Sequence, residues 1–429
     1  MIMENSEKLW TGKVPDNWKF YKGKYIFGER SERGNAINLQ LLSPTQKYGV
    51  IPQSMYDELT SMKSVKVKED TDLSTFKTIH RGDFCISLRS FQGGFEYSEY
   101  EGVVSPAYHV LFSKMDICAE YYKYLFKEQR FIAEMNSYCQ SLRDGKNISY
   151  FDFGRTLIPF PPLSEQQSIA DYLDETCSKI DEIIAEAKAS IDEYRELKQS
   201  VIFEAVTKGL DKNINVYKTG NSWIPLLPAG VKLSRFGLHH DIILGKMLCP
   251  TPRNEEDTLE PYYCAANVHF DGVTGELKTM WFNSKEKETY VVHKNDMLIV
   301  EGGAGAGGAA IMNEEPPVST FVQNSIMIVR SHMKDNRYSC YLVQALVKNK
   351  YVDVVCNKAT IPHFTKEKVS CMPYPVFNRN ERNEIANYLD ERCKQIDSLI
   401  SEKESLINDL EAYKKSLIYE VVTGKRRVV

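Results

Sequence analysis

The sequence predicts an α+β fold: two mostly-β domains joined by two long antiparallel coiled-coil helices, with an internal pseudo-twofold repeat. Two observations carry this prediction. Residues 165–207 align without a gap on residues 381–423, with about 19 of 43 positions identical. Both copies lack proline and glycine and place apolar residues at heptad spacing. A long internal duplication indicates one structural unit used twice, and a sustained heptad indicates a coiled coil.

Each copy of the repeated segment is expected to be one continuous helix. Apolar residues form two seam rows in each copy, and three lysines in total interrupt these rows. In the first copy the rows are Cys177, Ile184, Ile191, Lys198, Ala205 and Leu173, Ile180, Ala187, Tyr194, Val201. In the second copy they are Cys393, Ile400, Ile407, Lys414, Val421 and Leu389, Ile396, Lys403, Leu410, Leu417. Ser164, with Gln167 completing a capping box, is the expected N-cap of the first helix, and Asn380 that of the second. Gly209 and Gly424 are the expected stop signals.

The helices divide the chain into a first domain (1–162), a central helix (163–210), a second domain (211–377) and a distal helix (378–429). The second domain connects the end of one helix to the start of the other. Because the ends of a compact domain usually lie close together, the distal helix is expected to run back along the central one. This arrangement predicts an antiparallel pair with one domain at each end.

Composition favours an ordinary globular protein, since 42% of the residues are hydrophobic and 26% are charged. No apolar run approaches the ~20 residues that a membrane span requires, and the first residues lack a signal-peptide pattern, so we expect a cytoplasmic protein. The ten cysteines form no Cys-x-x-Cys pair. Neither a disulfide framework nor a structural zinc site is therefore expected.

No catalytic or metal-binding pattern stands out. The run Gly302–Gly308 lacks the Gly-Lys-Ser/Thr ending of a P-loop and the following helix of a dinucleotide fingerprint. Glu315-Pro-Pro-Val318 lacks the Asn or Asp and the aromatic residue of a methyltransferase motif. His239-His240-Asp241 has no third ligand at a suitable spacing, and we expect these residues to be solvated. The chain is therefore expected to be non-catalytic by itself and to hold no metal.

Several polar loops could instead contact DNA. Arginine, glutamine and asparagine can bond to base edges, and lysine to phosphates, while glycine lets the backbone approach a groove. The candidate DNA-binding residues are Thr45, Gln46, Lys47, Arg89, Ser90, Gln92, Arg143, Lys146 and Asn147 in the first domain, and Asn267, His269, Lys278, Lys358, Thr360 and His363 in the second. The net charge of −4 does not oppose this interpretation, because phosphates respond to local patches.

The chain resembles the specificity subunits of type I restriction-modification systems. The run Ile158-Pro-Phe-Pro-Pro-Leu-Ser-Glu-Gln-Gln167, with Ile169-Ala-Asp-Tyr-Leu-Asp174, is similar to the start of their conserved helix. Arg81-Gly-Asp83 and Ser105-Pro-Ala-Tyr108 are similar to a pattern of their target-recognition domains. The second copy departs from the family, because Tyr374–Asn380 replaces the proline-rich entry.

The resemblance implies that each domain reads one half of a bipartite site in double-stranded DNA and that the helices set the spacer. It also implies two methyltransferase subunits as partners, joined by restriction subunits in the full complex. The chain itself would need no cofactor, since S-adenosylmethionine and ATP would bind the partner subunits. An alternative interpretation is a coiled-coil scaffold whose end domains bind proteins.

Overall fold

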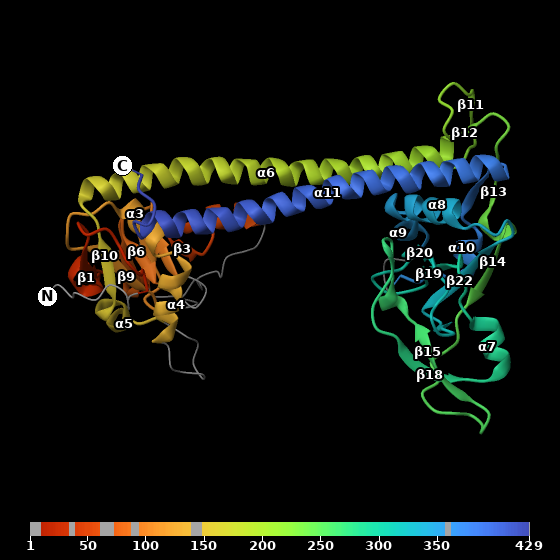
Figure 1. Ribbon diagram of the computed structural model, residues 1–429, viewed down its shortest axis with the longest axis horizontal. Coiled ribbons are helices and arrows are strands. Elements are labelled where there is room, and N and C mark those ends of the chain that lie inside the picture. The colour runs from red at the N-terminus through yellow and green to blue at the C-terminus, as the bar shows by residue number, and fades with distance from the viewer. Residues whose placement is uncertain are drawn as a thin grey trace. The chain divides into compact units, whose positions relative to one another are not determined.

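The computed structural model describes residues 10–33, 39–60, 73–86, 94–138, 148–356 and 362–428. The chain divides into two compact units. Unit 1 comprises residues 1–187 and 404–429, and unit 2 comprises residues 188–403. Each unit therefore contains one domain and half of each long helix (Figure 1).

Unit 1 is built on a four-stranded antiparallel sheet of order β2-β9-β6-β7. Its elements are β1 (Lys19–Lys22), α1 (Gly23–Ile26), β2 (Phe27–Glu29), β3 (Leu42–Thr45), β4 (Gly49–Pro52), α2 (Gln53–Thr60), η2 (Leu73–Thr75), β5 (Lys77–Ile79), β6 (Phe84–Ile86), β7 (Phe95–Tyr97), β8 (Gly102–Val104), β9 (His109–Ser113), α3 (Ala119–Leu125), α4 (Gln129–Ser137), α5 (Tyr150–Arg155) and β10 (Leu157–Phe160). Phe27, Phe84 and Phe126 pack edge-on or tilted in its core.

Unit 2 is built on a four-stranded antiparallel sheet of order β14-β22-β19-β20. Its elements are β11 (Val216–Lys218), β12 (Leu226–Pro228), β13 (Lys232–Arg235), η4 (Phe236–Leu238), β14 (His240–Leu244), β15 (Thr258–Tyr263), η5 (Ala265–Asn267), β16 (Val268–His269), β17 (Gly272–Val273), β18 (Lys278–Phe282), α7 (Ser284–Tyr290), β19 (Met297–Val300), β20 (Ala309–Ile311), β21 (Phe321–Val322), β22 (Ile326–Ser331), α8 (Arg337–Lys348), α9 (Tyr351–Val355), α10 (Lys366–Ser370) and β23 (Pro373–Val376).

The two central sheets have the same strand order and register. In unit 1, Phe27 faces Ser113, and Phe84 faces both Leu111 and Tyr97. In unit 2, His240 faces Ser331, and Met297 faces both Val329 and Ile311. Strands β2, β9, β6 and β7 therefore correspond to β14, β22, β19 and β20. The structure thus extends the duplication from the long helices into the domains.

The two long helices are continuous, as the heptads predicted. Helix α6 spans Leu163–Lys208 and α11 spans Arg379–Val422. Gly209 and Gly424 end them with φ of +74° and +69°, a conformation that favours glycine. Both predicted caps were wrong. Ser164 lies inside α6, and Asn378, rather than Asn380, shares a reciprocal capping box with Glu381.

In each unit the halves of the two helices pair in antiparallel register. In unit 1, Lys414 Nζ lies 2.6 Å from both carboxylate oxygens of Asp181. In unit 2, Lys198 Nζ lies 2.6 and 2.7 Å from those of Asp397. Two of the three lysines that interrupt the seam are therefore partnered from the facing helix. The residue numbers of the two partners have the same sum in both pairs, so each unit pairs the helices in the same antiparallel register.

Each domain holds the C-terminal turn of one long helix through a buried tyrosine. The Tyr121 hydroxyl donates to the Val422 carbonyl at 2.9 Å in unit 1, and the Tyr338 hydroxyl donates to the Val206 carbonyl at 2.8 Å in unit 2. Burial raises the pKa of both phenols well above the usual value, so they remain donors. These bonds satisfy carbonyls that a helix end leaves without an intrahelical partner.

Within the ranges described above, no helix is both long and apolar enough to cross a membrane.

Candidate nucleic-acid interface

The connections at one end of the unit 2 sheet bring together two of the polar segments selected in the second domain, residues 267–269 and the segment that carries His363. Strands β14 and β19 run toward this end, and β22 and β20 start from it. We call it the loop end. It carries the loop after Leu244, the turn 323–325 and the hairpin loop 301–308.

The hairpin loop between β19 and β20 is the glycine run, and it lies against His363. Gly302 forms a β-bridge with His363, and the Gly303 amide donates to the Pro362 carbonyl at 3.3 Å. Gly303 and Gly307 have φ of +90° and +84°. A Cβ on Gly302 would lie 3.1 Å from His363 Nδ1. The glycines therefore shape a tight turn that supports an exposed histidine, which agrees with the sequence-based rejection of a phosphate-binding loop.

The segment 267–269 lies beside the same glycine loop, since a Cβ on Gly308 would be 3.5 Å from the Val268 carbonyl oxygen. His269 is exposed, whereas Asn267 is only 3% exposed. The Asn267 amide donates to the Thr274 and Glu276 carbonyls, and its oxygen accepts from the Cys264 amide. Asn267 is therefore occupied in shaping its loop, and a base contact would require these bonds to be broken. Lys278 is exposed at the first position of β18.

A polar turn that the sequence analysis missed completes the loop end. Residues 323–325 connect β21 to β22, and the Ser325 carbonyl accepts from the Glu301 amide. The Ser325 hydroxyl donates to the Gln323 side chain, and the Asn324 side chain is partly exposed. No motif marks Gln-Asn-Ser as a site. Only its place next to the glycine loop makes it a candidate.

In unit 1, most of the candidate residues lie outside the described residues. These unit 1 residues are Arg89, Ser90, Gln92, Arg143, Lys146 and Asn147. The unit 2 candidates Lys358 and Thr360 also lie outside the described residues. The topology still relates them. Residues 87–94 connect β6 to β7, as 301–308 connect β19 to β20. Residues 138–149 connect α4 to α5, as 356–365 connect α9 to α10. The loops selected separately in the two domains are thus two pairs of equivalent connections.

Thr45 ends β3, and Gln46 and Lys47 lie in the turn that leads to β4. The Thr45 hydroxyl accepts from the Tyr48 amide and donates to the Gly49 carbonyl, so it fixes the turn. Gln46 and Lys47 are exposed, and the Gln46 carbonyl accepts from Lys127. Thr45 therefore has a structural task, while Gln46 and Lys47 present exposed side chains on this turn.

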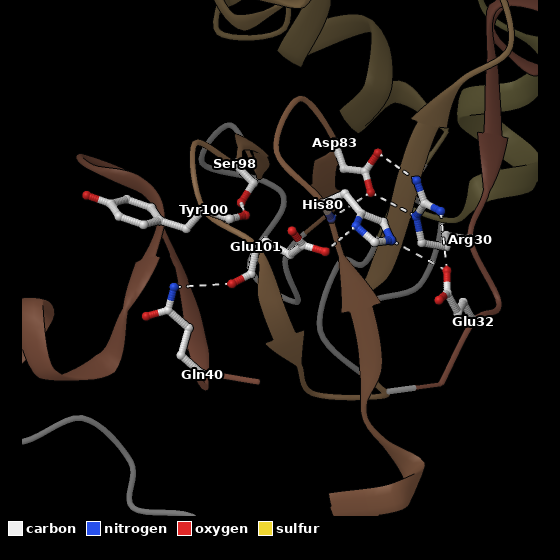
Figure 2. A network of polar contacts seen from close by, with 8 residues as sticks. All are labelled: Arg30, Glu32, Gln40, His80, Asp83, Ser98, Tyr100 and Glu101. Carbon is white, nitrogen blue, oxygen red and sulfur yellow. Dashed lines mark hydrogen bonds and ion pairs between the residues drawn. The ribbon is translucent and has the colours of Figure 1, made fainter. Parts of the chain in front are cut away.

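The opposite end of each sheet is held by an arginine–aspartate clamp, which Figure 2 shows for unit 1. In unit 1, Arg30 Nε and Nη2 lie 2.8 and 3.1 Å from the Asp83 carboxylate, which also accepts from the His80 amide. His80 Nδ1 lies 2.8 Å from Glu101 Oε1. Asp83 is only 5% exposed. The His80–Asp83 turn is thereby fixed at the start of β6, the strand that leads to the loop carrying Arg89.

Unit 2 repeats this clamp with an arginine from another strand. Arg330 Nε and Nη2 lie 2.8 Å from the two oxygens of Asp296, which accepts from the His293 amide. These bonds raise the pKa of Arg330. By register, Arg330 corresponds to Phe112, over whose ring the Arg30 guanidinium lies at 5.1 Å. The clamp is common to both units, but its arginine directly follows β2 in unit 1 and lies in β22 in unit 2.

The prediction that His239-His240-Asp241 is solvated was wrong for His240, which is 3% exposed. Its Nδ1 lies 2.9 Å from the Phe236 carbonyl and therefore donates, so Nε2 is left to accept from the Ser339 hydroxyl at 2.8 Å. Burial lowers its pKa to about 4. His240 is a core residue. In the described part of the chain, no three His, Cys, Asp or Glu side chains are grouped as metal ligands.

Known proteins resemble this chain along nearly its full length. A family model for the type I restriction modification DNA specificity domain matches residues 15–193. Two proteins of Methanocaldococcus jannaschii, a putative type I restriction enzyme MjaX specificity subunit and the MjaVIII specificity subunit, are 23% and 22% identical. Each alignment covers 99% of this chain, with 97% and 96% of the respective relative.

Two solved structures share the fold. One is a chain from a study of complex assembly and conformational transition of the type I R-M system, with a TM-score of 0.73 at 15% identity. The alignment covers 96% of this chain and all of that one. The HsdS subunit from Thermoanaerobacter tengcongensis gives 0.56 at 16% identity, with 98% and 100% covered. The predicted fold class is confirmed. The family model thus matches residues 15–193, and the chain is similar to type I specificity subunits along nearly its full length, in agreement with the resemblance seen in the sequence.

Proposed function

We propose that this chain is the DNA specificity subunit of a type I restriction-modification complex. One observation carries the proposal: the two units share a sheet, a clamp and a helix pair but present unrelated sequences in equivalent loops. A protein that recognises two different half-site sequences with one scaffold needs this combination. The common parts position the loops, and the divergent parts contact bases.

The loop end of unit 2 supplies the expected kinds of group. His363 and His269 are exposed on either side of a glycine loop, and Gln323 and Asn324 lie nearby. Imidazole and amide groups bond to base edges, and a glycine loop allows backbone to approach a groove. We propose that this end enters a groove of the second half-site and that the equivalent loops of unit 1, with Arg89, enter the first.

The partners follow from the same proposal. Two methyltransferase subunits would dock on the helices and carry S-adenosylmethionine, and restriction subunits with ATP would join them for cleavage. The chain would itself be non-catalytic and would act in the cytoplasm. Binding of DNA would weaken with rising salt, because contacts with phosphates release counterions.

The test uses the chain reconstituted with its methyltransferase partner. A His269→Ala, His363→Ala variant should methylate sites in which the sequence preference is relaxed in one half and unchanged in the other half. The matched control is His332→Ala, because His332 follows β22 at the opposite end of the same sheet and its side chain is 51% exposed. If the double variant changed the sequence preference of both half-sites, or if the control relaxed the preference of one, the assignment of the loop end to base recognition would be contradicted. If the chain were only a scaffold protein, methylation would show no DNA sequence preference in the unmodified chain or in any variant.

A further inference from the structure

Two neighbouring apolar side chains project from the loop that follows β14. Met247 is 71% exposed and Leu248 is 55% exposed. They lie between Lys246 and Cys249, which are 4% and 5% exposed. The chain is therefore buried on both sides of this pair and leaves only its two central side chains in solvent.

The loop is held in this position by its backbone and by an ion pair. The Lys246 amide donates to the Val322 carbonyl at 3.0 Å, and its carbonyl accepts from the Asn324 amide at 2.8 Å. The Lys246 ammonium donates to the Trp281 carbonyl at 2.7 Å and to the Glu286 carboxylate. A side chain at Gly245 would clash with the Gln323 carbonyl. These contacts fix the loop, so Met247 and Leu248 cannot fold back into the core without breaking them.

The pair lies at the loop end of the sheet. Strand β14 ends at Leu244, and Lys246 forms a bridge with Gln323 in the turn 323–325. The Ser325 carbonyl of that turn accepts from Glu301, where the glycine loop begins. Met247 and Leu248 therefore share the end of the sheet that carries His363.

We propose that Met247 and Leu248 form an apolar wedge that inserts at a base step of the half-site bound by unit 2; this inference rests on the proposed function. Proteins that kink DNA insert methionine or leucine side chains between base pairs, and the stacked faces of the bases are the apolar surface that DNA offers. A protein partner is a poorer occupant, because a stable interface buries ~800 Å² on each side and needs more than two side chains.

The duplication gives the wedge an internal control. By register Arg30 corresponds to Ile243, and three residues further along the chain stand Arg33 and Lys246. Their bridges differ, since Arg33 pairs with Lys77 in the antiparallel sense and Lys246 pairs with Gln323 in the parallel sense. By sequence offset alone, Met247 and Leu248 align with Gly34 and Asn35, which lie outside the described residues. Neither is a large apolar residue. The wedge therefore belongs to the second half-site alone, and only that half is expected to contain an unstacked step.

The experiment places 2-aminopurine at successive positions of both half-sites and measures its fluorescence on binding the complete methyltransferase complex. The methylated base is left unsubstituted, because its extrusion by the methyltransferase would raise fluorescence independently. The test variant is Met247→Ser, Leu248→Ser. The matched control is Leu238→Ser, since Leu238 is 69% exposed and precedes β14 at the opposite end of the sheet.

We expect fluorescence to rise at one step of the second half-site and to stay low at the first. The double variant should lose this rise and bind its site roughly tenfold more weakly, because the gain from burying the two side chains is largely offset by the cost of unstacking the base step. The control should behave as the unmodified chain. A uniform signal, or a rise that persists in the double variant while methylation stays sequence-specific, overturns the wedge and leaves the proposed function standing. Absence of any sequence preference in the unmodified complex overturns both.

Discussion

Moving the clamp arginine from one strand to another is the sharpest test of the duplicated architecture. The first step is Arg30→Ile, which gives unit 1 the residue that unit 2 has at the equivalent position, Ile243. The side chains of Asp83 and Arg30 are 6% and 21% exposed. Removing one partner of a buried pair costs ~3–5 kcal/mol, and because Arg30 keeps some contact with water we expect about 2–3 kcal/mol of lost stability.

The second step adds Phe112→Arg, which places the arginine where unit 2 has Arg330. Gly28 faces Phe112 across the strands and leaves room for the new side chain. We expect the double variant to recover at least half of the lost stability, because Arg330 reaches Asp296 from the same register. Native-state hydrogen exchange of the full chain measures this directly, with peptides from β6 reporting on unit 1 and peptides from β19 serving as the internal control.

Two results would refute this reasoning. If Arg30→Ile cost less than about 0.5 kcal/mol, the clamp would be no more than a surface ion pair. If Phe112→Arg recovered nothing while β19 kept its protection, the register equivalence of the two sheets would be wrong.

Three other predictions concern the helices and the core. Tyr121→Phe and Tyr338→Phe should each lower stability by about 1 kcal/mol in urea unfolding, since each removes a buried hydrogen bond to a helix carbonyl; equality with the unmodified chain would contradict this. Deleting residues 186–192 together with 402–408 preserves both seam ion pairs and shortens each helix by about 10 Å. The spacer between the methylated half-sites should then shrink by about three base pairs, and an unchanged spacer would exclude the helices as its ruler. Finally, the His240 pKa is lowered to about 4, so its contribution is complete above the unfolded value of 6.5 and is lost as pH falls toward 4; in His240→Asn the stability should vary less with pH over this window.

The helices were predictable because their signal is local and repeated. Heptad spacing and the closing glycines identify α6 and α11 to within one or two residues at most ends. The seam lysines were visible only as interruptions. Their aspartate partners depend on the antiparallel register, which only the fold fixes. The helix starts were misplaced because several polar residues follow the prolines, and only the backbone decides which one caps.

The loops were much less predictable. Arg89 and its neighbours were selected for an arginine and amides, and Arg143, Lys146 and Asn147 for cations and an amide, whereas the glycine run was only rejected as a phosphate-binding loop. That two of these are equivalent connections appears only when the strand registers are compared. Asn267 looked like a base reader because burial cannot be seen from one polar residue in a loop. Met247 and Leu248 continue an apolar run and gave no sign of exposure.

The most direct test of the central claim is the set of DNA sites methylated by this chain with its methyltransferase partner, obtained by sequencing methylated bases in a random plasmid library. We predict one bipartite, asymmetric motif: two different words separated by a spacer of fixed length and free sequence. Methylation with no sequence preference, or a single continuous word, would contradict the account.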